Sequence, residues 1–239
     1  DTSAQFGPLV KPIITPRFVP SCTSELMTGL AKLAKEYDVP VQSHLSENHG
    51  EIDWVASLHP ESSNYTDVYY EHHLMGTVPT VMAHCIHLSD VEMDRMAETQ
   101  TMVSHCPYSN VNLSSGIAPI RKLIERNIPI GLGSDISGGH IVSMAKVLTE
   151  AIGLSKMKWA EVDPNYAPLT LSEAFYMATK GGGQFFGHVG SFEKGYELDA
   201  LIIDDTSLFD PNERSLEERL ERWLYVGDDR HIIERYVAG

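Results

Sequence analysis

The chain has 239 residues, of which 42% are hydrophobic and 21% are charged, and its formal net charge at pH 7 is −15. This size and balance are typical of a globular protein that can bury one large core. The negative charge argues against nucleic acid or an anionic membrane surface as a partner, because either would require a basic patch. It favours a small neutral or polar substrate.

Short apolar runs alternate with helical patterns through the first 135 residues. The apolar runs predict strands over 9–16, 39–44, 80–85, 101–106 and 128–135. The patterns between them predict helices over 24–37, 49–57, 66–75, 90–98 and 117–127. Such alternation is typical of parallel strands in a (β/α) barrel.

The second half of the chain is predicted to be mainly helical before its character changes. The segment Gly138-Gly139-His140 is predicted to lead into a helix that ends at about Lys156, and a further helix is predicted over 170–179. From Glu197 onward the pattern predicts a strand at 198–203, a charged helix at 215–224 and a last strand at 231–237. We therefore expect a barrel part over 1–196 and, over 197–239, a strand and helix segment of a small β domain.

About five barrel strands are predicted, whereas a closed (β/α)8 barrel of the TIM type has about eight. An open parallel sheet would leave an unpaired edge and an uncovered face. We therefore expect the N-terminal strands of the barrel to lie upstream of Asp1, which is not a methionine. Residues 1–239 alone are then expected to be inactive.

The three cysteines, Cys22, Cys85 and Cys106, form no Cys-x-x-Cys pair and cannot all be paired with one another. We expect reduced thiols in a cytoplasmic protein. No apolar run of the sequence is long enough to cross a bilayer. We therefore expect no membrane partner.

Three predicted strands end in a residue that can bind a metal or move a proton: His44, His84 and Asp135. Because the active sites of (β/α) barrels lie at the carboxyl ends of the strands, we expect these residues to converge. Imidazole and carboxylate suit a divalent ion, which lowers the pKa of a bound water to about 7. We expect His44 and Asp135 to be metal ligands, with at least one further ligand from elsewhere.

Glu47 follows His44 by three residues, in the loop after the strand. A carboxylate so placed can take a proton from the attacking water and return it to a substrate nitrogen or leaving group. We expect His84 to contact the attacking water or the developing oxyanion. His87 is the alternative to His84, and we prefer His84 because the apolar run over 81–83 leads directly to it.

Other residues of these types are assigned structural roles. Tyr65, Tyr69 and Tyr70 are expected to be packing residues. Surface positions are expected for His49, His59, His72 and His73.

Five motifs occur in a fixed order: Thr15-Pro16-Arg17-Phe18, Ser43-His44-Leu45-Ser46-Glu47, Ala83-His84-Cys85, the segment 104–110 and Gly133-Ser134-Asp135. From Thr15 to about Asp199, the chain resembles the guanine deaminases of the amidohydrolase superfamily. These enzymes also have a His-x-His metal-binding pair at the end of the first barrel strand, and no such pair occurs here.

The resemblance implies that zinc, or alternatively iron, is held by His44 and Asp135. It implies that Glu47 is the proton shuttle, that His84 orients water and contacts the substrate, and that Arg17 with Phe18 binds the purine. The implied reaction is hydrolytic deamination of guanine to xanthine and ammonia, by a homodimer of the full-length protein.

Two alternatives stay open. A related aminohydrolase would act on another purine, a pyrimidine or a triazine ring. A metal-free, amidohydrolase-like scaffold protein would have no activity. The other class of zinc deaminases combines His-x-Glu with Pro-Cys-x-x-Cys, and this combination does not occur in the sequence.

Overall fold

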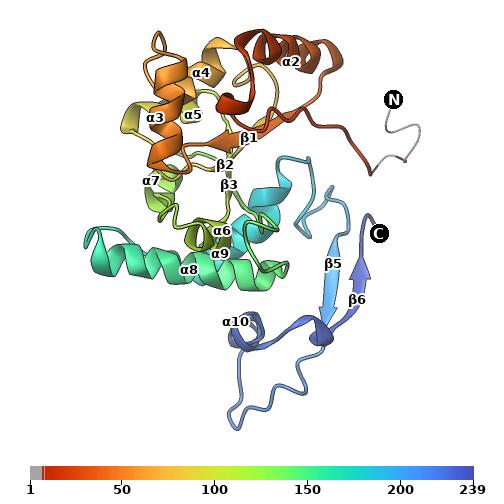
Figure 1. Cartoon of the computed structure of the whole chain (residues 1–239). Coiled ribbons are helices and arrows are strands. Elements are labelled where there is room, and N and C mark those ends of the chain that lie inside the picture. The colour runs from red at the N-terminus through yellow and green to blue at the C-terminus, as the bar shows by residue number, and fades with distance from the viewer. Residues whose placement is uncertain (1–6, 8) are drawn as a thin grey trace. The chain divides into compact units, whose positions relative to one another are not determined.

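The computed structural model describes residue 7 and residues 9–239 (Figure 1). The remaining residues of the expected barrel part, 1–6 and 8, lie outside the described residues. The chain divides into two compact units. The first comprises 1–104 with 122–129, and the second comprises 105–121 with 130–239. The boundary expected between 196 and 197 stays a prediction.

Four strands form one sheet in the order β1-β2-β3-β4. They are β1 (Val41–Leu45), β2 (Thr80–His84), β3 (Met102–His105) and β4 (Ile130–Leu132). Strand β2 is parallel to both β1 and β3. The register pairs His44 with Ala83 and Leu45 with His84, so the carboxyl ends of β1 and β2 lie side by side. The predicted α/β class is confirmed.

The strand predicted over 9–16 is wrong in extent. Ile14 forms an isolated parallel bridge with Val41, and no longer ladder forms around it in the described residues. Pro12 and Pro16 flank this bridge and have no N–H group to donate to a neighbouring strand. The ladder therefore stops at one residue.

Helices of the first unit begin where their sequence signals place them. They are α2 (Ser24–Tyr37), α3 (His49–Leu58), α4 (Tyr65–Glu71) and α5 (Asp90–Glu98), preceded by the 3-10 turn η1 (Val19–Ser21). Thr23, Asn48, Asn64 and Ser89 cap α2 to α5, each accepting a hydrogen bond from a backbone N–H in the first turn. Methionines fill much of the core, and Met27, Met82 and Met96 are fully buried.

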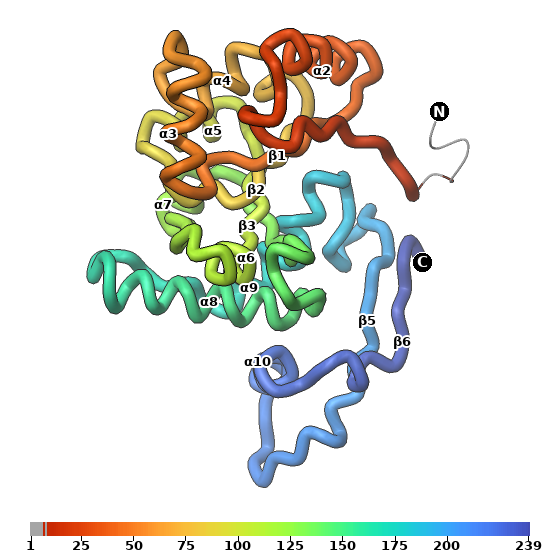
Figure 2. Tube along the Cα trace, viewed as in Figure 1, coloured from red at the N-terminus to blue at the C-terminus, as the bar shows by residue number. Residues whose placement is uncertain are grey.

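The second unit contains helices that pack around α8 (Met144–Glu161) and a two-stranded sheet. Its helices are α6 (Pro107–Asn112), α8 (Met144–Glu161), α9 (Leu171–Tyr176) and α10 (Leu216–Val226), with the single turns η2 (Met177–Gly181) and η3 (Asp229–His231). Strands β5 (Ala200–Ile203) and β6 (Ile232–Tyr236) are antiparallel, and Figure 2 traces them side by side. Lys146 of α8 donates to the carbonyl oxygen of Tyr225 in α10 at 2.7 Å.

Two helices need separate mention. Helix α6 lies between the predicted strand 101–106 and the predicted helix 117–127, where no helix was predicted. Pro107 begins it, because proline at the first helical position sacrifices no intrahelical hydrogen bond. Helix α7 (Ile120–Glu125) is shorter than the helix predicted over 117–127. In the part of the chain that the structure describes, no helix is long and apolar enough to cross a membrane.

An ion pair at the start of α9 gives a prediction about stability and pH. The Arg121 guanidinium donates to both carboxylate oxygens of Glu173, at 2.7 and 2.9 Å. This contact, helped by the Thr170 cap, lowers the pKa of Glu173 from 4.5 to about 2. Because the pKa is lowered in the folded state, the pair stabilises the fold above pH 4.5, and the contribution is lost as the pH falls towards 2.

Glu173→Gln should therefore lower the melting temperature at pH 7 and have little effect near pH 2. A half-exposed pair contributes up to about 1 kcal/mol, or roughly 2–4 °C in a chain of this size. Thermal melts across this pH range measure the difference. Glu98→Gln is the matched control, since Glu98 pairs with Arg95 on the exposed surface. A melting-temperature difference that is independent of pH would contradict the assignment.

Candidate active site

Three of the predicted site residues, His44, Glu47 and His84, lie together in the first unit. The rings of His44 and His84 are stacked, with centroids 5.3 Å apart and an angle of 23° between their planes. The Nε2 atom of His84 is 3.6 Å from Oε2 of Glu47. His84 is 1% exposed and the Glu47 side chain 16%, so the carboxylate faces a largely buried imidazole. The structure therefore brings the two histidines and the carboxylate together.

One hydrogen bond sets the tautomer of His44. Its Nδ1 atom lies 2.6 Å from the carbonyl oxygen of Arg17. A carbonyl oxygen only accepts, so Nδ1 carries the hydrogen and Nε2 presents its lone pair. Metal-binding histidines are typically oriented in this way, by a second contact that fixes the ring and raises its basicity. Nε2 is therefore the His44 atom through which the predicted metal would be bound, and the metal-binding role stays a prediction.

The loops that follow β1 and β2 have an unusual backbone conformation. Ser46, His84 and Cys85 have φ angles of 50°, 71° and 51°. These angles lie in the left-handed region, which residues other than glycine rarely adopt. Each costs about 1–3 kcal/mol and persists only where other contacts impose it. Here Cys85 N–H donates to Leu45 O at 3.0 Å, and Ile86 N–H donates to Ser46 O at 3.2 Å. Such strain is concentrated at functional sites.

Arg17 and Phe18 lie a few residues after Ile14, which forms the bridge with Val41. The Arg17 guanidinium is exposed and lies 5.3 Å from the centroid of the Phe18 ring. The ring of Trp54 in α3 makes an edge contact with the Phe18 ring, and the two ring centroids are 6.2 Å apart. The sequence analysis assigned no role to Trp54. Trp54 is far from Phe18 in the sequence, so no local pattern predicts their contact.

Asp135 lies in the second unit, at the end of the β4 segment. Its carbonyl oxygen accepts from Gly139 N–H at 2.6 Å, closing a tight turn. A Cβ atom on Gly138 would lie 2.7 Å from Asp135 Oδ2, so a larger residue at this position would have to displace the carboxylate. Its convergence with His44 of the first unit stays a prediction.

The donor atoms fit zinc by type. His44 offers a ring nitrogen and Asp135 a carboxylate oxygen, the ligands that Zn²⁺ accepts in catalytic sites. Within residue 7 and residues 9–239, no three or more His, Cys, Asp or Glu side chains form a group that could hold a metal ion. The metal site therefore stays a prediction, supported by the chemistry of the two predicted ligands and by the tautomer of His44.

Two expectations about other residues change. His59 is buried, at 6% exposure, and its Nδ1 lies 3.5 Å from Glu61, so its surface placement is wrong. Burial and the neighbouring His59 lower the pKa of His72.

Tyr65 and Tyr69 are buried as expected. However, the Tyr65 hydroxyl donates a hydrogen bond to Glu51 and the Tyr69 hydroxyl donates one to the carbonyl oxygen of His44, so these residues do more than pack.

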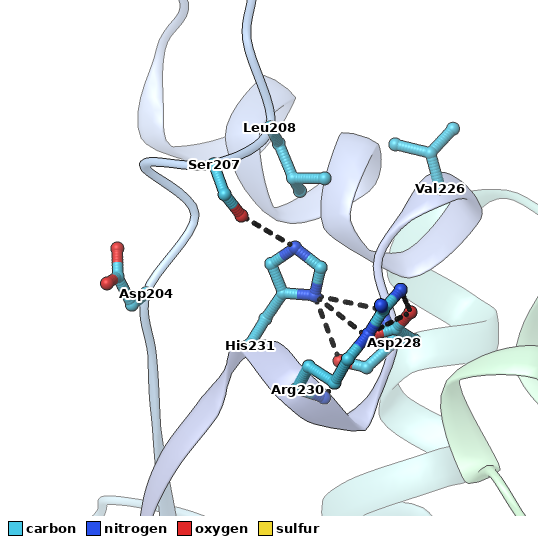
Figure 3. Close-up of a pocket in the computed structure, with 7 residues that line it drawn as sticks. All are labelled: Asp204, Ser207, Leu208, Val226, Asp228, Arg230 and His231. Carbon is cyan, nitrogen blue, oxygen red and sulfur yellow. Dashed lines mark hydrogen bonds and ion pairs between the residues drawn. The ribbon is translucent and has the colours of Figure 1, made fainter.

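A pocket of about 390 Å³ lies in the C-terminal part of the second unit (Figure 3). In it, Ser207 Oγ lies 3.2 Å from His231 Nε2, and His231 Nδ1 lies 3.2 Å from an oxygen of Asp228. The Ser–His–Asp order resembles a catalytic triad. However, Nδ1 of His231 also lies 3.1 Å from the backbone nitrogen of Asp228 and 3.2 Å from its carbonyl oxygen, so its contacts are local ones within residues 228–231. His231 and Asp228 form a capping box for η3.

Comparison with known proteins identifies the family of the chain. It matches the Amidohydrolase family over residues 4–239. Guanine deaminase of Dictyostelium discoideum is 45% identical over 99% of this chain and 54% of its own length. Human guanine deaminase is 39% identical over 96% of this chain and 53% of its own length. The chain thus spans about half the length of these relatives.

Solved structures agree with the sequence comparison. Guanine deaminase from C. acetobutylicum, with guanine bound in its active site, superposes with a TM-score of 0.94 and 55% identity, over 97% of this chain and 55% of that one. An adenosine deaminase from Xanthomonas campestris with bound zinc shares the fold, with a TM-score of 0.85 and 22% identity over 100% of this chain and 53% of that one. On the match to its sequence and on its fold, the chain belongs to the amidohydrolase family.

Proposed function

We propose that the intact protein containing this chain hydrolyses guanine to xanthine and ammonia. The observation that carries the proposal is the cluster of His44, Glu47 and His84 at the ends of β1 and β2. Similarity to guanine deaminases over nearly the whole chain supports guanine as the substrate.

Each residue is proposed to have a distinct role. His44 and Asp135 would hold Zn²⁺, which when bound lowers the pKa of a water molecule enough for attack at neutral pH. Glu47 takes a proton from the attacking water and delivers it to the ring nitrogen beside the amino-bearing carbon. It then takes the second proton of the same oxygen, as the new carbonyl group forms, and delivers it to the amino group, which leaves as ammonia. His84 hydrogen-bonds the attacking oxygen and stabilises the charge that develops on it.

A panel of substrates tests the proposal. Guanine, adenine, cytosine and an amino-triazine are supplied to the metal-loaded intact protein, and ammonia release is measured for each. Guanine should be turned over with xanthine as the product. If another ring is turned over in place of guanine, the protein is a related aminohydrolase with a different substrate. Absence of both turnover and bound metal would favour the scaffold alternative.

The proposed compartment is the cytoplasm. The three cysteines form no disulfide, which is consistent with a reducing environment. Fractionation of cells that express the intact protein measures this directly.

Arg17→Ala should weaken guanine binding. An exposed guanidinium at this position can donate charge-assisted hydrogen bonds to acceptor atoms of the purine. Loss of such a bond costs about 1.5–3 kcal/mol, or roughly tenfold to a hundredfold in kcat/KM. The loss should appear mainly in KM, measured by steady-state kinetics. Arg235→Ala, which removes an exposed arginine from β6, is the control. An unchanged KM and kcat in Arg17→Ala would leave Arg17 a structural residue.

A further inference from the structure

A buried hydrogen-bonded network links helix α4 to Glu47. Tyr65 and Tyr69 lie one helical turn apart on α4, with their rings stacked at 5.6 Å. The Tyr65 hydroxyl donates to Oε1 of Glu51 at 2.7 Å. The other oxygen of that carboxylate, Oε2, accepts from the backbone N–H of Glu47 at 2.9 Å. Glu51 is 8% exposed, and both of its carboxylate oxygens are therefore occupied in the interior.

The contact between Glu51 and Glu47 departs from ordinary helix capping. Asn48 is the N-cap of α3 and accepts from Glu51 N–H at 2.9 Å. In a capping box, the glutamate at this position would return a hydrogen bond to the backbone N–H of the N-cap residue. Glu51 instead reaches one residue further, to Glu47. Its side chain thus fixes the backbone of the proposed proton shuttle rather than the end of the helix.

A second branch of the network leads from the same helix to His44. Tyr69 is fully buried, and its hydroxyl donates to the carbonyl oxygen of His44 at 2.8 Å. Ser43 Oγ lies 2.7 Å from the same hydroxyl and donates to Pro16 O at 2.6 Å. When Ser43 donates its single hydrogen to Pro16 O, its oxygen can accept from Tyr69, whose hydroxyl also contacts His44 O.

Both tyrosines stay protonated over the working pH range. Burial is the main reason why the pKa of Tyr65 and of Tyr69 is raised above its ordinary value. Each hydroxyl is therefore a permanent donor, and each tyrosine holds a different part of the site. A proton-transfer group works only within a narrow range of positions, and a displacement of about 1 Å can cost a hundredfold in rate.

We propose that α4 is a positioning element with two separable functions: Tyr65, through Glu51, sets the position of Glu47, whereas Tyr69, with Ser43, sets the position of His44. The inference rests on the proposed function. It predicts that the two branches fail differently, since one affects proton transfer and the other affects metal binding.

The first branch is tested by kinetics of the intact protein. Glu51→Ala should lower kcat by roughly tenfold to a hundredfold, with KM and zinc content unchanged. Glu51→Gln should restore most of kcat, because its amide can accept from Glu47 N–H and donate to the Tyr65 oxygen. A Glu51→Ala protein that melts cooperatively and keeps the wild-type kcat would overturn this branch. If Glu51→Ala does not fold, Tyr65→Phe takes its place, with a lower kcat expected and a wild-type kcat overturning the branch.

The second branch is tested without any substrate. Zinc titration of the metal-free intact protein should show an affinity roughly 10–100-fold weaker in Tyr69→Phe, the loss typical of a group that supports a ligand. Tyr70→Phe is the matched control. Tyr70 is on the same helix, and the Arg95 guanidinium packs over its ring, 4.1 Å from the ring centroid. Unchanged zinc affinity in Tyr69→Phe would overturn this branch. A wild-type protein that binds zinc but does not deaminate guanine would instead refute the proposed function, and the zinc titration would still decide the role of Tyr69.

Discussion

Glu47→Gln is expected to lose most of its turnover while it keeps its metal and its affinity for guanine. Glutamine has nearly the shape of glutamate, and the backbone N–H of residue 47 can still donate to Glu51. The amide cannot take up and release a proton, and general acid–base help is typically worth about 10²–10⁴-fold in rate. The loss should therefore appear in kcat, with KM nearly unchanged.

Steady-state kinetics with guanine and metal analysis of the same preparation measure these effects. Glu36→Gln, on the exposed surface of α2, removes one negative charge elsewhere and should leave kcat unchanged. Near-normal turnover by Glu47→Gln with zinc still bound would remove Glu47 from the mechanism. His84 would then be the residue to examine, because its Nε2 lies 3.6 Å from the same carboxylate.

The meeting of His44, Glu47 and His84 could be predicted because it follows from topology. Parallel strands bring their carboxyl ends to one edge, and the observed register places His44 and His84 at adjacent ends. Apolar runs with a polar residue at the end are sufficient for this inference. Strand β1 begins two residues later than the predicted 39–44, because Pro40 has no N–H group to donate.

Other features could not be read from local patterns. The tautomer of His44 depends on a carbonyl group 27 positions away, and Glu51 becomes important only through its contacts with Glu47 and Tyr65. Tyrosines at helical spacing favour a packing interpretation, because the sequence does not show what their hydroxyl groups meet. The left-handed backbone at Ser46 and His84 has no glycine to signal it. These features arise from contacts that form only in the folded chain.

His44→Gln is expected to abolish tight zinc binding by the intact protein. His44 presents Nε2 because Nδ1 is held by the carbonyl oxygen of Arg17. Glutamine can keep a similar volume, but it replaces a basic ring nitrogen with a weakly basic amide. The loss of affinity should exceed the roughly 10–100-fold expected when only a supporting group is removed. It should therefore be larger than the loss in Tyr69→Phe.

Zinc titration of the metal-free protein, with and without guanine, measures this ranking. His188→Gln removes an exposed imidazole that contacts Tyr196 in the second unit, and it should bind zinc like the wild type. The activity of His44→Gln should fall in parallel with its zinc content and recover in part at high zinc concentration, because binding remains a mass-action equilibrium. If His44→Gln binds zinc as tightly as the wild type, His44 is not a ligand. The hydrogen bond to Arg17 O would then serve only to fix the segment before η1 to the end of β1.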